Sequence, residues 1–220
     1  LKFEDLSFHD ALKLYKNKPR NVVITADRIY SNSQKMKLFS EFSSRALNKA
    51  ELREYCTAIV SSVNTLPPQF DMEQLVISNS EKRFYDELLP DLYAMPNNVD
   101  FGPIFHDSKS INYKAHTNWI EWNSEIIHSR NTFPMEQLSN SKYELKRYVM
   151  NFCLLDFIHQ TGVIHTIMNR RKIHLPFFTR EFVVFGKPEK PGTYHTYAKL
   201  TGKTDDTSTF DIYLIGPENE

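Results

Sequence analysis

The sequence predicts an α+β fold: a mostly helical N-terminal body in residues 1–140, followed by a capped helix and a small antiparallel sheet in residues 141–220. Three observations predict it. Apolar residues recur at helical spacing through much of the first two-thirds. A capping-box motif precedes a long apolar-faced segment near residue 142. Three short apolar segments after residue 180 are separated by turn-rich joints. Because 220 residues also fit one large domain, the two parts could be continuous.

Several short helices and one strand are expected in the helical body. An apolar stripe through Leu52, Tyr55, Ile59 and Val63 predicts the longest of these helices, and Pro67-Pro68 ends it. The full set is a helix within 6–14, a strand over 21–25, and helices over 33–42, 49–63, 80–89 and 117–128. The prolines and asparagines of 90–113 predict a loop.

The helix over 142–160 has the clearest local signals. Ser141 and Glu144 form a capping box, in which each side chain satisfies a free backbone N–H of the first turn. Gly162 suits the left-handed residue just past a helix C-terminus. The strands expected after this helix cover 181–186, 193–200 and 209–215. Their short connections predict an antiparallel meander.

The composition is that of a folded protein without a membrane partner. Charged residues make up 25% and hydrophobic residues 40% of the chain, and its 16 Phe and 11 Tyr far outnumber its 6 Gly. No apolar run approaches the roughly 20 residues that span a bilayer, and no signal peptide is recognisable. Cys56 and Cys153 lie in apolar patterns typical of buried reduced thiols. A cytoplasmic or nuclear location is therefore expected.

A charge asymmetry points to a polyanionic partner. Residues 142–203 contain eleven basic and four acidic side chains, a balance of +7, although the whole chain is neutral. Such a basic segment with interleaved aromatic rings is typical of a nucleic-acid-binding surface, but charge runs are also often plain solvated faces. The predicted nucleic-acid-binding residues are Arg170, Arg171, Lys172, Arg180, Lys187, Lys190, Lys199, Lys203, Tyr194 and Tyr197.

The histidines do not predict a metal site. His159 and His165 are not at the i, i+4 spacing of a zinc-binding helix pair, and no other ligand follows at a suitable distance. In His165-Thr166 and His195-Thr196 the two side chains are adjacent, so in a strand they would point to opposite faces. That excludes a paired-histidine phosphoesterase site.

A metal-dependent nuclease is the enzymatic alternative. Asp91 and Asp100, followed by Lys114 and joined by His9, match the residue types of sites in which carboxylates hold Mn²⁺ or Mg²⁺ and a lysine stabilises charge. Pro90-Asp91 could equally begin a turn, and Asp100 lacks the following x-Lys that makes the motif specific.

Scattered short motifs resemble the acidic (PA) polymerase subunit of influenza-like segmented negative-strand RNA viruses. Residues 10–14 (DALKL), 99–101 (VDF) and 118–121 (NWIE) occur in an order similar to its central region, followed by the Thr-Asp-Asp turn at 204–206. This resemblance implies RNA contacts on the basic residues between Arg170 and Lys203. Residues 89–93 (LPDLY) are instead similar to the metal-binding stretch of that subunit's cap-snatching endonuclease, with Asp100 and Lys114 in the places of its next acid and lysine.

The sequence therefore predicts a non-catalytic RNA- or DNA-binding region of a larger assembly, which could be a viral RNA polymerase subunit. It would contact other protein subunits and need no cofactor. The alternatives are the Mn²⁺- or Mg²⁺-dependent endonuclease and a protein-interaction module whose basic segment meets an acidic partner.

Overall fold

The computed structural model describes residues 1–9, 22–43, 50–72, 75–84, 87, 119–133, 152–170, 176–185 and 190–217. The chain forms two compact units. The first contains Leu1–Leu66 and Pro176–Gly186, and the second contains Pro67–Leu175 and Lys187–Glu220. The predicted boundary between residues 140 and 141 lies outside the described residues.

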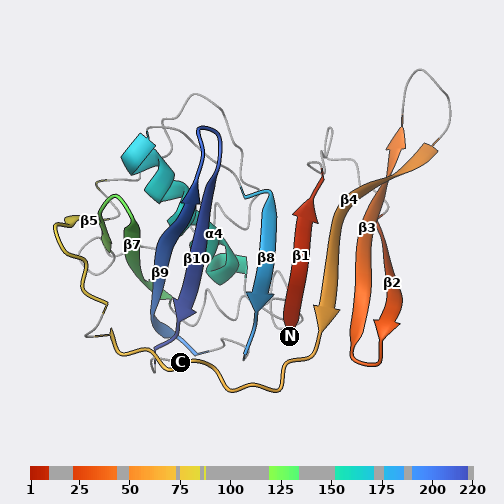
Figure 1. Cartoon of the computed structure of the whole chain (residues 1–220), viewed down its shortest axis with the longest axis horizontal. Helices are drawn as coiled ribbons and strands as arrows, with labels where there is room; N and C mark the ends of the chain where they lie inside the picture. Colours follow the sequence, from red (N-terminus) through yellow and green to blue (C-terminus); the bar gives the residue numbers. More distant parts are fainter. Residues whose placement is uncertain are drawn as a thin grey trace. The chain divides into compact units, whose positions relative to one another are not determined.

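The first unit is built on a five-stranded antiparallel sheet in the order β2-β3-β4-β1-β8. Its strands are β1 (Lys2–Phe8), β2 (Val22–Tyr30), β3 (Ser33–Ser43), β4 (Ala50–Ser61) and β8 (Phe178–Val183) (Figure 1). The amide of Val184 donates to the Leu1 carbonyl, and the amino terminus donates back to the Val184 carbonyl. These bonds extend the pairing of β8 with β1 at one end of both strands.

Strand β1 is bulged and bridges two acids. Its register with β4 shifts between Glu4 and Ser7, where Asp5 has a φ of 50°. Glu4 lies opposite Glu181 of β8, and the Lys2 ammonium is 2.9 Å from the first carboxylate and 2.8 Å from the second. This bridge offsets the repulsion that two facing carboxylates would otherwise cause.

The second unit has another five-stranded antiparallel sheet, in the order β10-β9-β7-β6-β5. The strands are β5 (Glu81–Phe84), β6 (Trp119–Trp122), β7 (Ile126–Phe133), β9 (Gly192–Lys203) and β10 (Ser208–Ile215). In the turn between β6 and β7, the Asn123 side-chain oxygen accepts the amides of Glu125 and Ile126 at 2.8 Å. This side chain supplies the hydrogen bonds that hold the hairpin turn.

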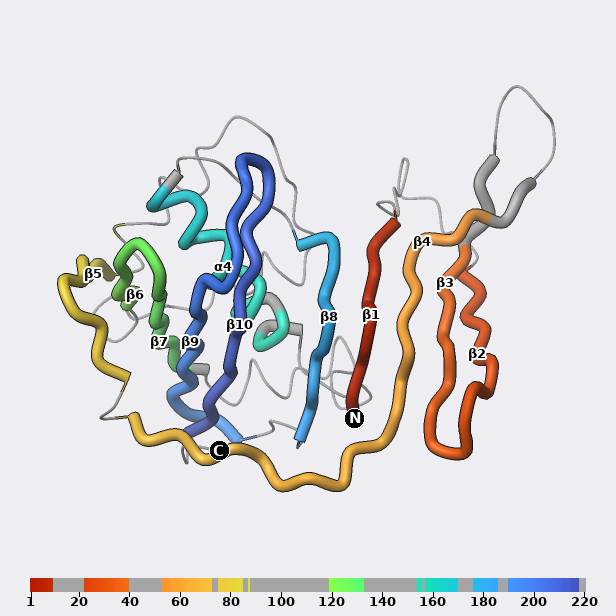
Figure 2. Tube along the Cα trace, in the orientation of Figure 1, coloured from red at the N-terminus to blue at the C-terminus, as the bar shows by residue number. Residues whose placement is uncertain are grey.

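Helix α4 (Phe152–Arg170) packs on one face of this second sheet (Figure 2). Leu154, Phe157 and Ile164 of the helix meet a sheet surface that alternates strictly along each strand. The sheet residues in this core are Ile120, Trp122, Ile127, Tyr194 and Ala198, and Met168, Phe210, Ile212 and Leu214 lie at its margin. No helix among the described residues is both long and apolar enough to cross a membrane.

The prediction of a mostly helical body is wrong, because the described part of that region is antiparallel sheet. The helices expected over 33–42 and 49–63 are β3 and β4, that over 80–89 contains β5, and that over 117–128 is the β6–β7 hairpin. The helix expected within 6–14 overlaps β1, and its remainder lies outside the described residues. The strand expected over 21–25 is found within β2.

Physical reasons for these errors lie in strands that bury parts of both faces. In β4, Tyr55 and Ala58 are buried although an odd number of positions separates them, so apolar residues do not alternate with a period of two. The β-branched and aromatic residues Tyr55, Thr57, Ile59 and Val60 were the better indicator of a strand.

The C-terminal region differs from the expected meander in one connection. β9 and β10 pair with each other, but β8 pairs with β1 of the first unit. The capping box at Ser141 and Glu144 lies outside the described residues. Gly162 does not end the helix, which continues to Arg170. A Cβ atom there would lie 3.6 Å from the Phe210 ring, so Gly162 permits close helix–sheet packing.

Candidate functional site

A buried chain of hydroxyl groups fixes helix α4 to strand β9. The Thr161 hydroxyl donates to the Phe157 carbonyl at 2.8 Å and lies 2.6 Å from the Thr196 hydroxyl. Since Thr161 uses its one proton on Phe157, Thr196 must donate to Thr161. Both threonines have no exposed surface. This directional link sets the rotation of α4 against the sheet, which apolar contacts alone specify less sharply.

Ser129 and Asn131 of β7 enlarge this polar region. Ser129 is paired with Thr196 across the strands and Asn131 with Tyr194, and both side chains are buried. Among the described residues, the Ser129 hydroxyl oxygen and the Asn131 side-chain oxygen have no hydrogen-bond partner. Polar atoms left in this state inside a core are uncommon and mark this part of the helix–sheet interface as more than packing.

Helix α4 carries several groups suited to proton transfer. Asp156 is its only carboxylic acid, and Gln160 follows one helical turn later. Burial lowers the pKa of His159, which therefore stays neutral at pH 7 and can accept a proton. His165 is buried, with its ring 5.2 Å from that of Phe210. The helix thus brings an acid, an amide and imidazoles to one element packed over the sheet.

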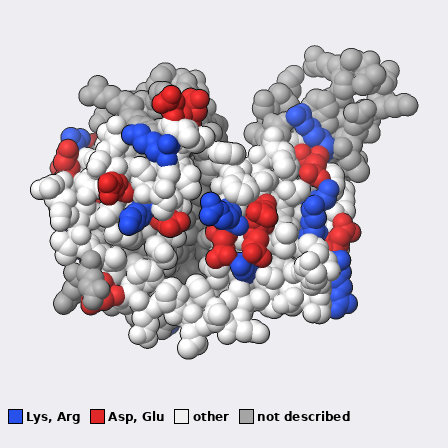
Figure 3. All heavy atoms as spheres, viewed as in Figure 1, with Lys and Arg blue, Asp and Glu red and all other residues white. Residues whose placement is uncertain are grey.

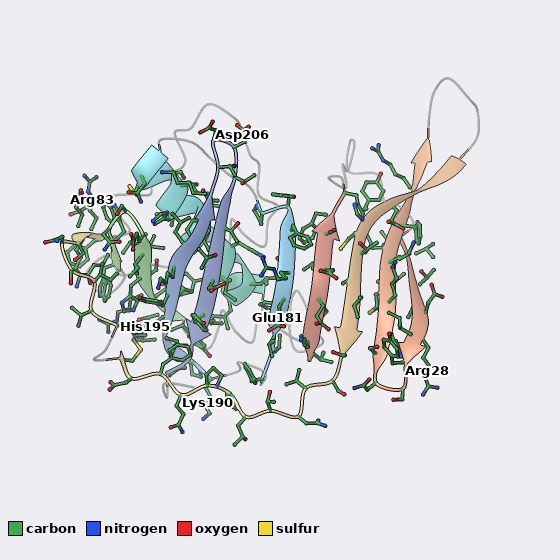
Figure 4. The ribbon with its side chains drawn as sticks, viewed as in Figure 1. Arg28, Arg83, Glu181, Lys190, His195 and Asp206 are labelled. Atoms are coloured by element: carbon green, nitrogen blue, oxygen red, sulfur yellow. The ribbon has the colours of Figure 1, made fainter. Side chains whose placement is uncertain are left out.

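A pair of histidines occupies the opposite face of the same sheet. His128 of β7 and His195 of β9 are diagonal neighbours, because His128 is paired with Tyr197 and Arg130 with His195. The His128 Nε2 and His195 Nδ1 atoms are 2.9 Å apart. One ring must donate its N–H to the unprotonated nitrogen of the other, so the contact requires at least one neutral imidazole. Figure 4 labels His195 on β9.

Aromatic and cationic groups surround this histidine pair. The Trp119 ring lies 4.9 Å from that of His128, and the Lys82 ammonium lies 3.9 Å from the Trp119 ring. Burial lowers the pKa of His128 to about 4, with additional contributions from His195 and Lys82. Burial and the Arg130 charge lower the pKa of His195 to about 4. Both rings are therefore neutral at pH 7, in a setting that disfavours an added cation.

The residues predicted to bind nucleic acid do not gather in one described surface. Arg180 lies on β8 in the first unit, whereas Lys190, Lys199 and Lys203 belong to the second. Lys199 is paired directly with Asp211. On the face drawn in Figure 3, the described Lys and Arg side chains lie among Asp and Glu side chains. Arg171, Lys172 and Lys187 lie outside the described residues, and Arg170 is the last residue of α4.

The two predicted tyrosines have different environments. Tyr194 is buried against α4, and its hydroxyl donates to the Lys190 carbonyl at 2.7 Å, so its ring face is not open for base stacking. Tyr197 is half-buried beside His128, with ring centroids 6.4 Å apart. Its place is within the histidine pair's surroundings.

Of the predicted nuclease set, only His9 is described. Its Nε2 lies 3.1 Å from the Thr57 hydroxyl and 3.4 Å from the Glu54 carboxylate in the first unit. Asp91, Asp100 and Lys114 lie outside the described residues.

The residues that organise the described interfaces were not singled out from the sequence. Thr161 and Thr196 gave no signal as a pair, because they are 35 positions apart on a helix and a strand. His128 was read as the end of a helix. Once residues 119–122 and 126–133 are taken as a hairpin with an Asn-Ser turn, alternation does place His128 and Trp119 on the same face.

Solved structures of similar fold cover almost the whole chain. A dehydratase domain of a trans-acyltransferase polyketide synthase from Brevibacillus brevis matches with a TM-score of 0.73 and 10% identity, over 99% of this chain and 71% of its own. The dehydratase domain of RzxB from Pseudomonas fluorescens matches with a TM-score of 0.70 and 13% identity, over 99% and 70%. A trans-acyltransferase polyketide synthase enoyl-isomerase matches with a TM-score of 0.62 and 10% identity, over 99% and 75%.

No protein-family model matches the sequence. No curated protein matches it either.

These likenesses correct three expectations. The fold is the mostly β hotdog arrangement of those dehydratase domains and not a helical body with a meander. The resemblance to the influenza-like polymerase subunit is wrong, because the structural neighbours are polyketide synthase domains. The predictions of nucleic-acid binding and of a nuclease are wrong for the same reason.

Proposed function

We propose that this chain forms part of a dehydratase that removes water from a hydroxylated acyl chain. The likeness to polyketide synthase dehydratase domains over 99% of the chain carries the proposal. About 70% of each of those domains is matched, so the complete reaction is proposed for the whole protein that contains these residues. Cys56 is a free thiol, which favours a reducing compartment such as the cytoplasm.

The chemistry needs two proton transfers. A base takes the proton from the carbon next to the thioester carbonyl, and an acid protonates the hydroxyl so that it leaves as water. A carbon–carbon double bond replaces the C–H and C–O bonds that break, and no oxidant or reductant is consumed. A carboxylic acid held in an apolar setting suits the acid role, because such a setting raises its pKa.

Asp156 is our candidate for that acid. It is the only carboxylic acid of α4, and the neighbouring positions Leu154 and Phe157 are buried against the sheet. Gln160, one turn later, could hold the acid or the substrate hydroxyl by hydrogen bonding. The Thr161–Thr196 link would then keep this turn of α4 in a fixed position over β9.

The test uses the full-length protein and a 3-hydroxyacyl N-acetylcysteamine thioester. The new double bond is followed by ultraviolet absorbance and the loss of water by mass spectrometry. We expect Asp156→Asn to slow elimination by at least about 100-fold, the usual contribution of a general acid. Asp211→Asn changes an exposed acid on β10 and should leave the rate unchanged. An Asp156→Asn protein of wild-type activity would refute the assignment of Asp156. A wild-type protein that eliminates water from no acyl thioester would refute the proposed function.

Double-bond isomerisation is the second candidate, because the enoyl-isomerase also matches over 99% of the chain. The same kinds of acid and base can move a double bond without releasing water. Incubation with an unsaturated thioester distinguishes the two: isomerisation preserves the substrate mass, whereas the reverse of dehydration adds one water.

A further inference from the structure

Strand β2 is the outermost strand of the first sheet and carries many exposed apolar side chains (Figure 1). Five of its nine residues are large, hydrophobic and exposed, with exposed fractions that reach 60% for Ile24 and 71% for Tyr30. The five are Val22, Val23, Ile24, Ile29 and Tyr30. Among the described residues, only β3 pairs with β2, so its outer edge has no described strand beside it.

The exposed apolar residues of β2 project from both faces of the sheet. Val22, Ile24 and Tyr30 lie on one face, and Val23 and Ile29 on the other, because side chains alternate along a strand. A helix laid over one face would therefore leave the other set in water. A further strand placed beside β2 would contact both sets at once and would also satisfy the backbone groups of the free edge.

Comparison with another edge of this molecule sharpens the argument. Strand β5 ends the second sheet, is four residues long and carries Glu81, Lys82 and Arg83. Short length and charge are the features by which natural proteins keep an edge strand from pairing. β2 has nine residues and no lysine, and its only charges are Asp27 and Arg28 near one end (Figure 4 labels Arg28).

The sequence of β2 is compatible with antiparallel pairing to itself. In the register of full overlap, Ala26 lies on the two-fold axis, Val22 faces the partner's Tyr30, and Val23 faces the partner's Ile29. Ile24 meets the aliphatic stem of the partner's Arg28, and Thr25 can donate to the carboxylate of the partner's Asp27. No two like charges face each other directly, and apolar pairs occupy both ends of the contact.

We propose that two copies of this chain associate through β2, pairing antiparallel about Ala26 so that the two first-unit sheets become one ten-stranded sheet. The interface is formed by the free edge of β2 alone and involves neither α4 nor the histidine pair. It is independent of the proposed dehydration.

A cysteine at the two-fold axis tests both the association and its register. In a background with Cys56→Ala and Cys153→Ala, the Ala26→Cys side chain would face its own copy at a Cα separation of about 4.5–5.5 Å, which suits a disulfide. Lys35→Cys is the matched control, because Lys35 is exposed and pairs with Asp27 but lies one strand inside the edge. Under mild oxidation, we expect Ala26→Cys to form covalent dimers at least about tenfold faster than Lys35→Cys.

Light scattering coupled to size exclusion gives the second measurement. The wild-type chain should have twice its single-chain mass at micromolar concentration, and Ile24→Lys should return it to the mass of one chain with an unchanged circular dichroism spectrum. A monomeric wild-type protein that shows no preferential cross-linking at position 26 would overturn the proposal. So would a dimer that survives Ile24→Lys and does not cross-link there, because its interface would lie elsewhere.

Discussion

Protonation of the His128–His195 pair should weaken the second sheet in mild acid. The rings share one hydrogen bond, and burial holds the pKa of His128 at about 4, whereas an unfolded histidine titrates near 6.5. The unfolded chain therefore takes up a proton below pH 6.5 that the folded chain refuses until about pH 4. The free energy of unfolding must fall as the pH falls through this window.

The size of this effect follows from the pKa difference. A lowering of about 2.5 units at about 1.4 kcal/mol per unit gives roughly 3 kcal/mol for His128 when the window is fully crossed, of which about 2 kcal/mol is lost by pH 5. His195 adds less than a second full share, because it is more exposed and its titration is linked to that of His128. A drop of roughly 2–3 kcal/mol between pH 7.5 and pH 5 is therefore expected from the pair.

Urea unfolding followed by tryptophan fluorescence measures this change in the right unit, because Trp119 and Trp122 both lie in β6. His128→Gln keeps a hydrogen-bonding side chain but cannot be protonated, so its stability should fall by about 2 kcal/mol less than that of the wild type over the same pH range. His9→Gln, an exposed histidine of the other unit, should keep the wild-type pH dependence. Equal losses in wild type and His128→Gln would refute the reasoning.

Two further substitutions test other contacts by the same unfolding measurement. Thr161→Val should cost about 1–3 kcal/mol because it leaves the buried Thr196 hydroxyl without its partner, whereas Thr161→Val with Thr196→Val should cost clearly less than the two single changes added together. Strict additivity would show that the two hydroxyls do not interact. Gly192→Ala should cost about 1–3 kcal/mol, because Gly192 has a φ of 153° and the new Cβ would lie 2.7 Å from the Pro217 ring. Gly202→Ala, whose Cβ would meet Thr209 at an ordinary 3.5 Å, should be nearly neutral, and a Gly192→Ala protein as stable as that control would contradict the predicted clash.

Local signals in the sequence were strongest where one kind of evidence stood alone. The turn residues around 187–192 and 201–206 correctly separate the last strands, and the apolar segment around Phe157 is correctly helical. Helical periodicity misled in β3 and β4, where half-buried residues on both faces blur the two-residue alternation. The β-branched and aromatic content of these segments, given more weight, would have corrected the fold class.

The organisation of the site was less accessible from the sequence. The Thr161–Thr196 and His128–His195 contacts join residues 35 and 67 positions apart, and each depends on the register of strands that were not recognised. Local charge, by contrast, was visible and misleading. The +7 balance of residues 142–203 does not survive folding as one surface, because its strands are divided between two units and Lys199 is paired with Asp211.

The return of the chain to its first unit has a consequence for biosynthesis. Strand β8 fills the place beside β1, where Lys2 is paired with Val183, so the first sheet is completed only after about 180 residues have been made. At roughly 5–20 residues per second, β1 waits on the order of ten to thirty seconds for this neighbour. Until then its exposed side is available for wrong pairing, and a nascent chain of this protein should need a chaperone more than its modest length suggests.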